Sequence, residues 1–382
     1  MNTSFLHSVA NKINKKQNSI FTYPVEKQKK YVEHFPEPKD GVERSYFQYR
    51  CQAKMQGALL QALLSFSALP LSIFYLLKLG KSSEKEESFD AVFFNEGKPF
   101  NIIPDELLGK YDKIKTISTV QGCLSKEDRR FLRKIFKRYP FSWLLWLKLI
   151  LKISQYSHAI TKYSPKAVIA CTEFSFTASI LTEYCHFRGV ELVNVMHGEK
   201  LYYMRDSFVK FDEFYVWNQQ YVDLLCSLRA DKDQFRIAVP KSLRISIDDS
   251  VTVKYDYTYY LGEETIEELG RISENLSKLK DGGKEVSIRP HPRYSNVAEI
   301  NKIFEFANVE DTKTVTIEQS LLQTKNAVSL YSTVLMQAYS SGINVVIDDV
   351  AAPQKFSKLE ELGYVMLKVP HRKMSELVTE TD

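Results

Sequence analysis

The sequence predicts an α/β fold of two Rossmann-like domains facing a cleft, with a helical N-terminal extension. Apolar runs of strand length alternate with helix-forming runs from about residue 81 onward, as in a parallel sheet covered by helices. Residues 240–254 carry charges and few large apolar side chains, and they divide this alternation into two series. Residues 1–80 lack strand periodicity. We therefore expect a helical region over 1–80 within the first domain, and Rossmann-like domains over 81–245 and 250–375.

The expected strands are short β-branched or aromatic runs bounded by turn-forming residues. In the first series they cover residues 91–94, 114–117, 167–170, 190–195 and 213–217. In the second series they cover residues 255–261, 286–288, 314–317, 327–331, 344–347 and 364–369. In open parallel sheets ligands bind at the carboxyl ends of the strands, so functional residues are sought there.

Composition narrows the class of protein. The chain has 382 residues, of which 44% are apolar and 13% aromatic, enough to fold around two cores. A formal net charge of +5 is mild and does not call for a nucleic-acid partner. The five cysteines form no CxxC pair, and neither a phosphate-binding P-loop nor metal-ligand spacing is present. We expect no metal, no cofactor, no export signal and a cytoplasmic location.

Two segments suggest contact with a membrane. Residues 57–77 are uncharged, and because Pro70 interrupts them we interpret them first as two buried helices and second as a membrane-embedded segment. Residues 129–152 place six basic side chains before FSWLLWLKLILK, a pattern typical of a helix at an anionic bilayer surface as well as of a core helix with a basic end. Peripheral attachment is the joint expectation.

The second half carries a candidate phosphate site. The strand expected at 286–288 runs into RPHPR, and the strand expected at 327–331 reaches two hydroxyls where a helix begins. A helix N-terminus offers unpaired N–H groups and a positive dipole end, which suit a phosphate group. A diphosphate leaving group is therefore expected near Arg289, His291, Pro292, Arg293, Ser332 and Thr333.

The first half carries candidate bases. The strand expected at 190–195 ends in Met-His-Gly-Glu, which places His197 and Glu199 at a strand end where Gly198 relaxes the backbone. Glu96 follows an earlier strand and is a third candidate base. Glu173 opens onto the same rim, and we assign it to the donor-binding set. Which of His197, Glu199 and Glu96 acts as the base stays open.

Four motifs carry a resemblance to a known family. VNVMHGEK, FDEFYVWNQQY, RPHPR and VSLYSTVLMQAYSSGINVVIDD resemble the bacterial surface-polysaccharide glycosyltransferases of the GT-B fold, across residues 164–369. Their layout is similar to that of capsule and lipopolysaccharide transferases and of the teichoic-acid glycerophosphotransferases. The resemblance implies that His291 with Pro292, and Ser332 with Thr333, bind the donor nucleotide and phosphate. It also implies that His197 is the base.

The expected function is a metal-independent, inverting transfer of a sugar from a CMP-, CDP- or UDP-linked donor to a glycan or lipid-linked acceptor. Such a transfer needs a base for the acceptor hydroxyl and positive groups for the departing phosphate. Two alternatives remain: a CDP-polyol phosphotransferase and a non-catalytic glycan-assembly subunit. We expect the enzyme on the inner face of the cell membrane, bound peripherally to anionic lipid.

Overall fold

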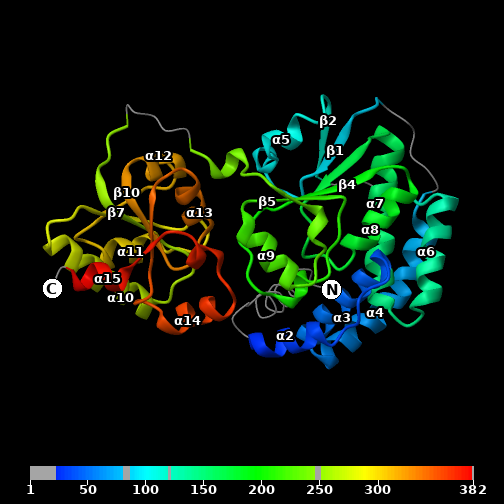
Figure 1. The fold of residues 1–382 in the computed structure, drawn as a ribbon, viewed down its shortest axis with the longest axis horizontal. Coiled ribbons are helices and arrows are strands. Elements are labelled where there is room, and N and C mark those ends of the chain that lie inside the picture. The colour runs from blue at the N-terminus through cyan, green and yellow to red at the C-terminus, as the bar shows by residue number, and fades with distance from the viewer. Residues whose placement is uncertain (1–22, 81–86, 119–121, 246–250, 381–382) are drawn as a thin grey trace. The chain divides into compact units, whose positions relative to one another are not determined.

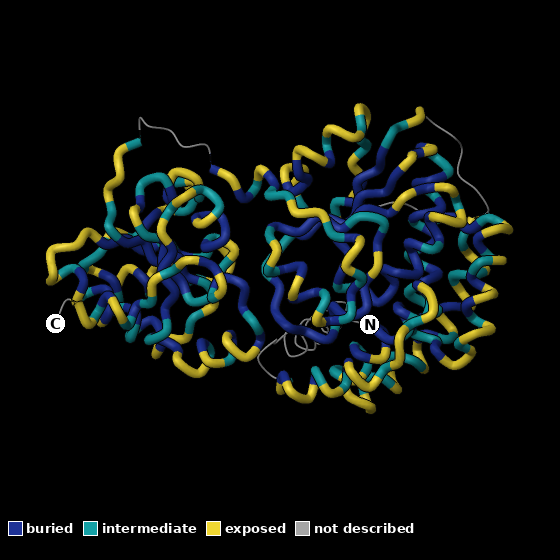
Figure 2. The backbone as a smooth tube through the Cα atoms, viewed as in Figure 1, coloured by how far each residue is buried: buried dark blue, intermediate teal, exposed yellow. Residues whose placement is uncertain are grey.

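The computed structural model describes residues 23–80, 87–118, 122–245 and 251–380, which form two compact units (Figure 1). Unit 1 comprises the described residues of Met1–His197 and Tyr202–Ala238, and unit 2 those of Gly198–Leu201 and Val239–Asp382. Each unit contains one six-stranded sheet whose strands are mostly buried (Figure 2). Every recorded strand pair is parallel. These sheets confirm the prediction of two Rossmann-like domains; the cleft stays a prediction.

The sheet of unit 1 has the order β2-β1-β3-β4-β5-β6. Its strands are β1 (Ala91–Phe94), β2 (Ile114–Ile117), β3 (Ala167–Ala170), β4 (Glu191–Val195), β5 (Glu213–Val216) and β6 (Phe235–Ile237). The sequence patterns predicted the first five of these, whereas β6 is three residues long at the sheet edge and was missed. Chain order reverses between β1 and β3, which makes their carboxyl ends the switch point where ligands bind in such sheets.

Helices cover both faces of this sheet because successive side chains of each strand point to opposite sides. Phe93 of β1 shares an apolar cluster with Ile103 and with Leu107 of α5 (Asp105–Leu108). Its neighbour Phe94 instead stacks on Tyr156 of α7 (Trp143–Tyr163), with ring centroids 4.8 Å apart. The remaining helices of this half are α6 (Lys126–Arg138), α8 (Ala178–Phe187) and α9 (Gln219–Ser227).

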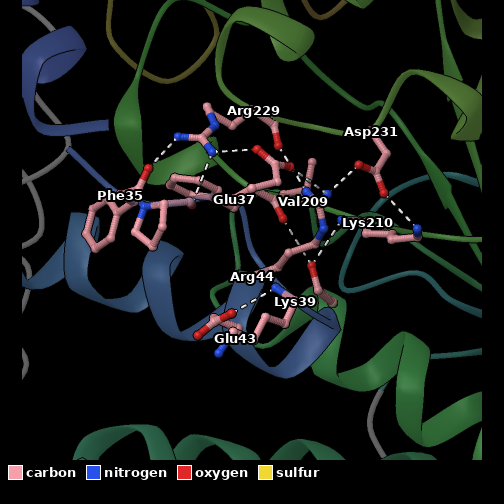
Figure 3. Close-up of polar contacts among 12 residues, drawn as sticks. Phe35, Glu37, Lys39, Glu43, Arg44, Val209, Lys210, Arg229 and Asp231 are labelled. Carbon is pink, nitrogen blue, oxygen red and sulfur yellow. Dashed lines mark hydrogen bonds and ion pairs between the residues drawn. The ribbon is translucent and has the colours of Figure 1, made fainter. Parts of the chain in front are cut away.

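A helical N-terminal region is present, as predicted, although residues 1–22 lie outside the described part. It comprises α2 (Val25–Glu33), α3 (Gly41–Gln56) and α4 (Ala58–Lys78). Two arginines fasten it to unit 1 (Figure 3). Arg229 donates to the carbonyls of Phe35 (2.8 Å) and Pro36 (3.1 Å), while buried Arg44 pairs with Asp231 and donates to the Arg229 carbonyl (3.0 Å). Each guanidinium therefore satisfies carbonyls that the turn after α2 and the loop after α9 leave unpaired.

The prediction of two buried helices over residues 57–77 is wrong, because α4 is one 21-residue helix. Pro70 lies inside it. Proline removes one backbone hydrogen bond, but the helix continues on both sides. Most of its apolar side chains are exposed. A helix of this length and composition passes the simple criteria for a membrane span.

A buried carboxylate fixes α6 against α7 and α8. Asp128 accepts hydrogen bonds from Ser157 (2.6 Å), Tyr184 (2.7 Å) and Arg188 (2.9 Å), and it forms a capping box with Ser125 at the start of α6. Burial opposes ionisation of Asp128, but these donors hold its pKa below the ordinary value. The ionised Asp128 on the buried side of α6 thus holds this basic helix against α7 and α8.

The sheet of unit 2 has the order β12-β11-β10-β7-β8-β9, which is the dinucleotide-binding Rossmann order with its switch point between β7 and β10. The strands are β7 (Tyr255–Tyr260), β8 (Val286–Arg289), β9 (Asn308–Val309), β10 (Thr324–Ser329), β11 (Asn344–Ile347) and β12 (Arg372–Lys373). The helices are α10 (Ile266–Asp281), α11 (Val297–Ile303), α12 (Ile317–Leu322), α13 (Thr333–Ser340), α14 (Pro353–Glu361) and α15 (Met374–Thr379).

Two strands expected in unit 2 are wrong. Residues 314–317 lead into α12, which begins at Ile317, and Thr316 and Gln319 form a capping box there, so local capping prevails over the β-branched composition. Residues 364–369 contain a 3-10 helix, Val365–Lys368. The edge strands β9 and β12 lie elsewhere and are two residues long, too short to leave an alternating pattern.

We expect Arg44→Met to lower the free energy of unfolding by about 2–4 kcal/mol, since it leaves buried partners of the guanidinium unsatisfied. Urea unfolding at neutral pH measures this. The matched control is Lys29→Met, which removes an exposed 3.0 Å pair with Glu26 and should change stability by less than about 0.5 kcal/mol. Equal effects of the two changes would show that Arg44 does not anchor the N-terminal helices.

Candidate functional site

The carboxyl edge of the sheet in unit 1 gathers a buried carboxylate and a histidine. Glu173 follows β3 and is fully buried, and His197 follows β4. Nδ1 of His197 lies 3.4 Å from Oε1 of Glu173. Asn194 donates from Nδ2 to the other carboxylate oxygen (3.0 Å), and its own Oδ1 accepts from the N–H of Thr172 (2.7 Å). A buried carboxylate requires such partners, and here they fix its orientation.

This geometry assigns a role to each imidazole nitrogen. Nδ1 faces a carboxylate, so the neutral ring carries its proton there and Nε2 holds the lone pair. The same division of roles operates in serine hydrolase triads, where a buried acid orients a histidine and stabilises its charged form. His197 and Glu173 therefore form a dyad that can take a proton at Nε2. The sequence interpretation had grouped Glu173 with the donor residues; the structure places it beside His197.

Arg205 lines the same edge from the 3-10 helix Met204–Asp206. Its guanidinium carbon lies 4.8 Å from the ring centroid of Tyr203 and 5.6 Å from that of Phe174, whose ring is 6.0 Å from the His197 ring. Nε of Arg205 lies 3.1 Å from the Asp206 carboxylate. The cation is thus held between aromatic faces close to the dyad.

Glu96 lies in a tight turn at the end of β1. Its φ is +45° and that of Gly97 is +82°, and the N–H of Lys98 donates to the carbonyl of Asn95 at 2.7 Å. A non-glycine residue in this conformation is strained, and strain of this kind is concentrated at functional sites. Oε1 of Glu96 lies 2.5 Å from Nζ of Lys152 on α7. The turn therefore aims Glu96 toward α7.

Lys148 lies one helical turn before Lys152. Its Nζ is 4.0 Å from the ring centroid of Phe176. Burial lowers the pKa of Lys148 to about 8, helped by the charges of Lys152 and Arg205 and opposed by Glu96. Sequence reasoning missed Lys148, Lys152 and Arg205 as site residues. Two lysines four residues apart in the leucine-rich run WLLWLKLILK were the readable signal.

In unit 2, His291 follows β8. Its Nδ1 accepts the N–H of Arg293 (3.1 Å), its backbone N–H donates to Ser295 (2.8 Å), and its ring stacks on Tyr294 with centroids 4.5 Å apart. Burial and the adjacent Arg293 lower the pKa of His291 below its ordinary value. The proton therefore resides on Nε2, which can donate to a phosphate oxygen.

The other residues of RPHPR divide into buried and exposed groups. Arg289 pairs with the buried carboxylate of Glu310 (2.7 Å) and donates to the carbonyl of Val315 (3.0 Å). Because Glu310 neutralises most of its positive charge, Arg289 is suited to positioning the loop. Pro292 and Arg293 are exposed. Of this motif, His291 and Arg293 are the groups best placed to meet a ligand.

The start of α13 is where the sequence predicts an anion seat. Ser332 is the N-cap, and its hydroxyl accepts the N–H of Val334 at 3.2 Å, while Thr333 is exposed at the first helical position. The first turn of α13 carries no acidic residue. By contrast, α10, which also begins at the switch point, has Glu267 and Glu268 in its first turn. Because carboxylates repel phosphate, α13 is the better seat of the two.

The loops around this seat are anchored by buried groups. Asp348, after β11, accepts the N–H groups of Val350 and Ala351 (both 2.9 Å) and the hydroxyl of Tyr259 (2.8 Å), and burial raises its pKa. Glu199 belongs to the segment of unit 2 that includes residues 198–201, and it interacts electrostatically with Tyr364. It thus falls in a different unit from His197. Among the described residues, no group of three or more His, Cys, Asp or Glu could hold a metal ion.

We expect Lys148→Met to stabilise the protein at pH 7. The pKa of Lys148 is about 8 in the folded protein and higher in the unfolded chain. Keeping this lysine charged therefore lowers the free energy of unfolding; the loss is complete below pH 8 and disappears as the pH rises toward 10.5. The variant should gain on the order of 1 kcal/mol below pH 8, with the gain shrinking as pH rises. Thermal unfolding across pH 6–10 measures it. Lys137→Met, on the exposed face of α6, is the control; a destabilised Lys148→Met would contradict this account.

Comparison with known proteins gives structural likeness alone. No family model and no curated protein sequence matches the chain. Among solved structures, it is similar to a UDP-GlcNAc 2-epimerase from Neisseria meningitidis bound to UDP-GlcNAc, with 12% identity, a TM-score of 0.44, and 77% of this chain and 90% of that chain covered. The chain is also similar to the wall teichoic acid polymerase TagF, with 10% identity, a TM-score of 0.39 and 88% of each chain covered. A third similar structure is LpCGTa in complex with UDP, with 10% identity, a TM-score of 0.41, and 78% of this chain and 90% of that chain covered.

Proposed function

We propose that this protein is a glycosyltransferase of the GT-B type that moves a sugar, with inversion and without a metal ion, from a nucleotide-activated donor to a growing bacterial surface glycan. The observation that carries the proposal is the buried Glu173 carboxylate beside His197 at the switch point of unit 1. It is supported by an acid-free helix start at the switch point of unit 2. The sheet edge of unit 1 can activate a hydroxyl, and the sheet edge of unit 2 can hold a diphosphate.

In the proposed reaction, Nε2 of His197 takes the proton of an acceptor hydroxyl. The acceptor oxygen forms a bond to the anomeric carbon of the donor sugar, and the bond from that carbon to the diphosphate oxygen breaks. The positive charge that develops on the imidazole is stabilised by Glu173, which remains ionised. Attack opposite the departing diphosphate inverts the configuration at the anomeric carbon.

The departing nucleoside diphosphate needs compensation for its charge. In unit 2 the groups that can supply it are Nε2–H of His291, the backbone N–H of Thr333 at the start of α13, and the positive end of the α13 dipole. These are neutral donors and a dipole, aided by the exposed Arg293. A preorganised donor of this kind contributes roughly 2–4 kcal/mol to transition-state stabilisation.

A CDP-polyol phosphotransferase is the second candidate. Lys148 interacts electrostatically with Lys152 and with Arg205, and Arg205 lies against Phe174 beside the dyad of unit 1. Such a group of cations suits a substrate that carries a phosphate of its own, as a polyol-phosphate chain does. In that reaction the activated hydroxyl attacks phosphorus instead of carbon, and CMP leaves instead of a nucleoside diphosphate.

We expect His197→Ala to reduce turnover by at least about a hundredfold and Glu173→Gln by at least about tenfold, since the first removes the base and the second removes the charge that supports it. The assay incubates the full chain with nucleotide sugars and CDP-polyols and measures released nucleotide. The donor that is consumed distinguishes the two transferase candidates: nucleotide released from a nucleotide sugar supports the glycosyltransferase, and CMP released from a CDP-polyol supports the phosphotransferase. No release with any donor would favour a non-catalytic glycan-assembly subunit.

His186→Ala is the matched control, because His186 also pairs with a carboxylate, Asp212 at 2.5 Å, but on the surface. Its turnover should equal that of the wild type. Near wild-type turnover in a folded His197→Ala protein would remove His197 as the base. Glu96 and Glu199 are the remaining alternatives, and an inactive Glu96→Gln or Glu199→Gln that still binds nucleotide would identify the base.

We expect His291→Ala to raise the KM for the donor at least about tenfold, equivalent to roughly 1.4 kcal/mol. His291→Gln, which keeps an N–H donor, should lose less. Because the lowered pKa keeps His291 neutral, the donor KM should be constant above about pH 6.5. A KM that rises as the pH increases through 6–7 would show that the imidazolium binds the donor instead. His371→Gln, in the same unit, is the control.

A further inference from the structure

An exposed apolar stripe runs along α4. Leu59, Leu63, Phe66, Phe74 and Leu77 recur at helical spacing, and each is largely exposed, with Leu59 at 77% and Leu77 at 82%. No charged residue occurs from Gly57 to Leu77. In water-soluble proteins, a helix normally buries such a stripe against other apolar residues. The described residues do not cover this face of α4, which indicates that an apolar partner covers it.

Contacts with α3 and α7 hold α4 in place within unit 1, and Phe66 of the stripe takes part in them. Gln61 donates to the hydroxyl of Tyr49 on α3 at 2.6 Å, and the ring of Phe66 lies 5.9 Å from that of Trp143 at the start of α7. Further along, Ala68 and Ser72 are buried. A helix that crossed a bilayer would have to leave these contacts. The geometry therefore favours a helix lying in the plane of a membrane surface.

Basic residues flank the C-terminal end of α4. Arg129 of α6 donates to the carbonyls of Leu76 (2.6 Å) and Leu79 (3.3 Å), which ties the two helices together. The exposed side of α6 carries Arg130, Arg133, Lys134 and Lys137. Phe141, in the turn between α6 and α7, is 83% exposed. Cations next to exposed aromatic and aliphatic side chains match the charge and depth profile of an anionic bilayer surface.

We propose that the exposed faces of α4 and α6 form a docking surface for an anionic phospholipid bilayer, with α4 lying in the interface. The apolar stripe enters the boundary between head groups and acyl chains, and the α6 cations contact the lipid phosphates. The surface would keep the protein peripheral, on the cytoplasmic face, within reach of a lipid-linked acceptor. The proposal stands on α4 and α6 alone and does not depend on the proposed chemistry.

The test measures partition of the full chain onto vesicles of phosphatidylglycerol mixed with phosphatidylcholine. We expect binding that weakens with salt, and much weaker binding to phosphatidylcholine alone. Changing Leu63, Phe66 and Phe74 together to Glu should lower the partition coefficient at least about a hundredfold. Charge reversal at Arg133, Lys134 and Lys137 should lower it at least about tenfold and flatten the salt dependence.

Matched controls carry equal changes at exposed sites elsewhere. Ile237, Ile266 and Val297 changed to Glu control for added charge, and Lys284, Lys302 and Lys313 changed to Glu control for lost cations. Both should bind vesicles more strongly than the corresponding α4 and α6 variants. Nucleotide release in detergent should be unaffected by the α4 changes, so failure of this proposal is distinguishable from failure of the proposed reaction.

Three results would overturn the proposal. The first is equal binding to neutral and anionic vesicles. The second is protein that alkaline carbonate cannot extract from membranes, since that indicates a helix crossing the bilayer. The third is a wild-type dimer that does not bind vesicles and that the α4 changes convert to a monomer, since that indicates a second copy of the chain as the occupant of the stripe.

Discussion

The fold concentrates its chemistry through the parallel arrangement of the strands in each sheet. Parallel strands all end at the same edge, so residues far apart in sequence, such as Glu96, Glu173 and His197, follow strand ends of one sheet edge. In unit 2 the same rule brings His291 and Ser332 to one edge, with β7 between their strands. Each set lies at or next to the point where the strand order reverses, where no crossover helix covers the edge.

The carboxyl edges of the two sheets differ in their charged groups, and this difference supports proposing proton removal at unit 1 and diphosphate binding at unit 2. Unit 1 holds the fully buried carboxylate of Glu173, which lies beside His197 and accepts a hydrogen bond from Asn194, and the charge of Arg205 interacts with it. In the proposed reaction this carboxylate orients the His197 ring and stabilises the imidazolium that forms. Unit 2 presents neutral N–H donors and a helix dipole, which in the proposed reaction hold the diphosphate as its charge grows during bond cleavage. In that proposal the acidic first turn of α10 disfavours the anion, and the first turn of α13, which carries no acidic residue, is its seat.

Sequence patterns predicted the central strands because buried parallel strands are continuous apolar runs, as in β1, β3 and β11. Edge strands of two or three residues leave no such pattern. The prediction for 314–317 failed because a capping box outweighs β-branched composition, and that for 57–77 failed because packing against α7 supports a helix through Pro70. The sequence places polar residues at the strand ends, as the structure does, whereas the Glu173–His197 contact and the placement of Lys148 depend on tertiary packing that one sequence does not reveal.

The measurement that tests the central claim most directly is a crystal structure of the full chain soaked with a nucleoside diphosphate. The account predicts phosphate oxygens within hydrogen-bond distance of the backbone N–H of Thr333 and of Nε2 of His291, and none within that distance of His197. Phosphates bound at the start of α10, or on the Lys148 and Arg205 side chains of unit 1, would contradict the assignment of donor and acceptor edges.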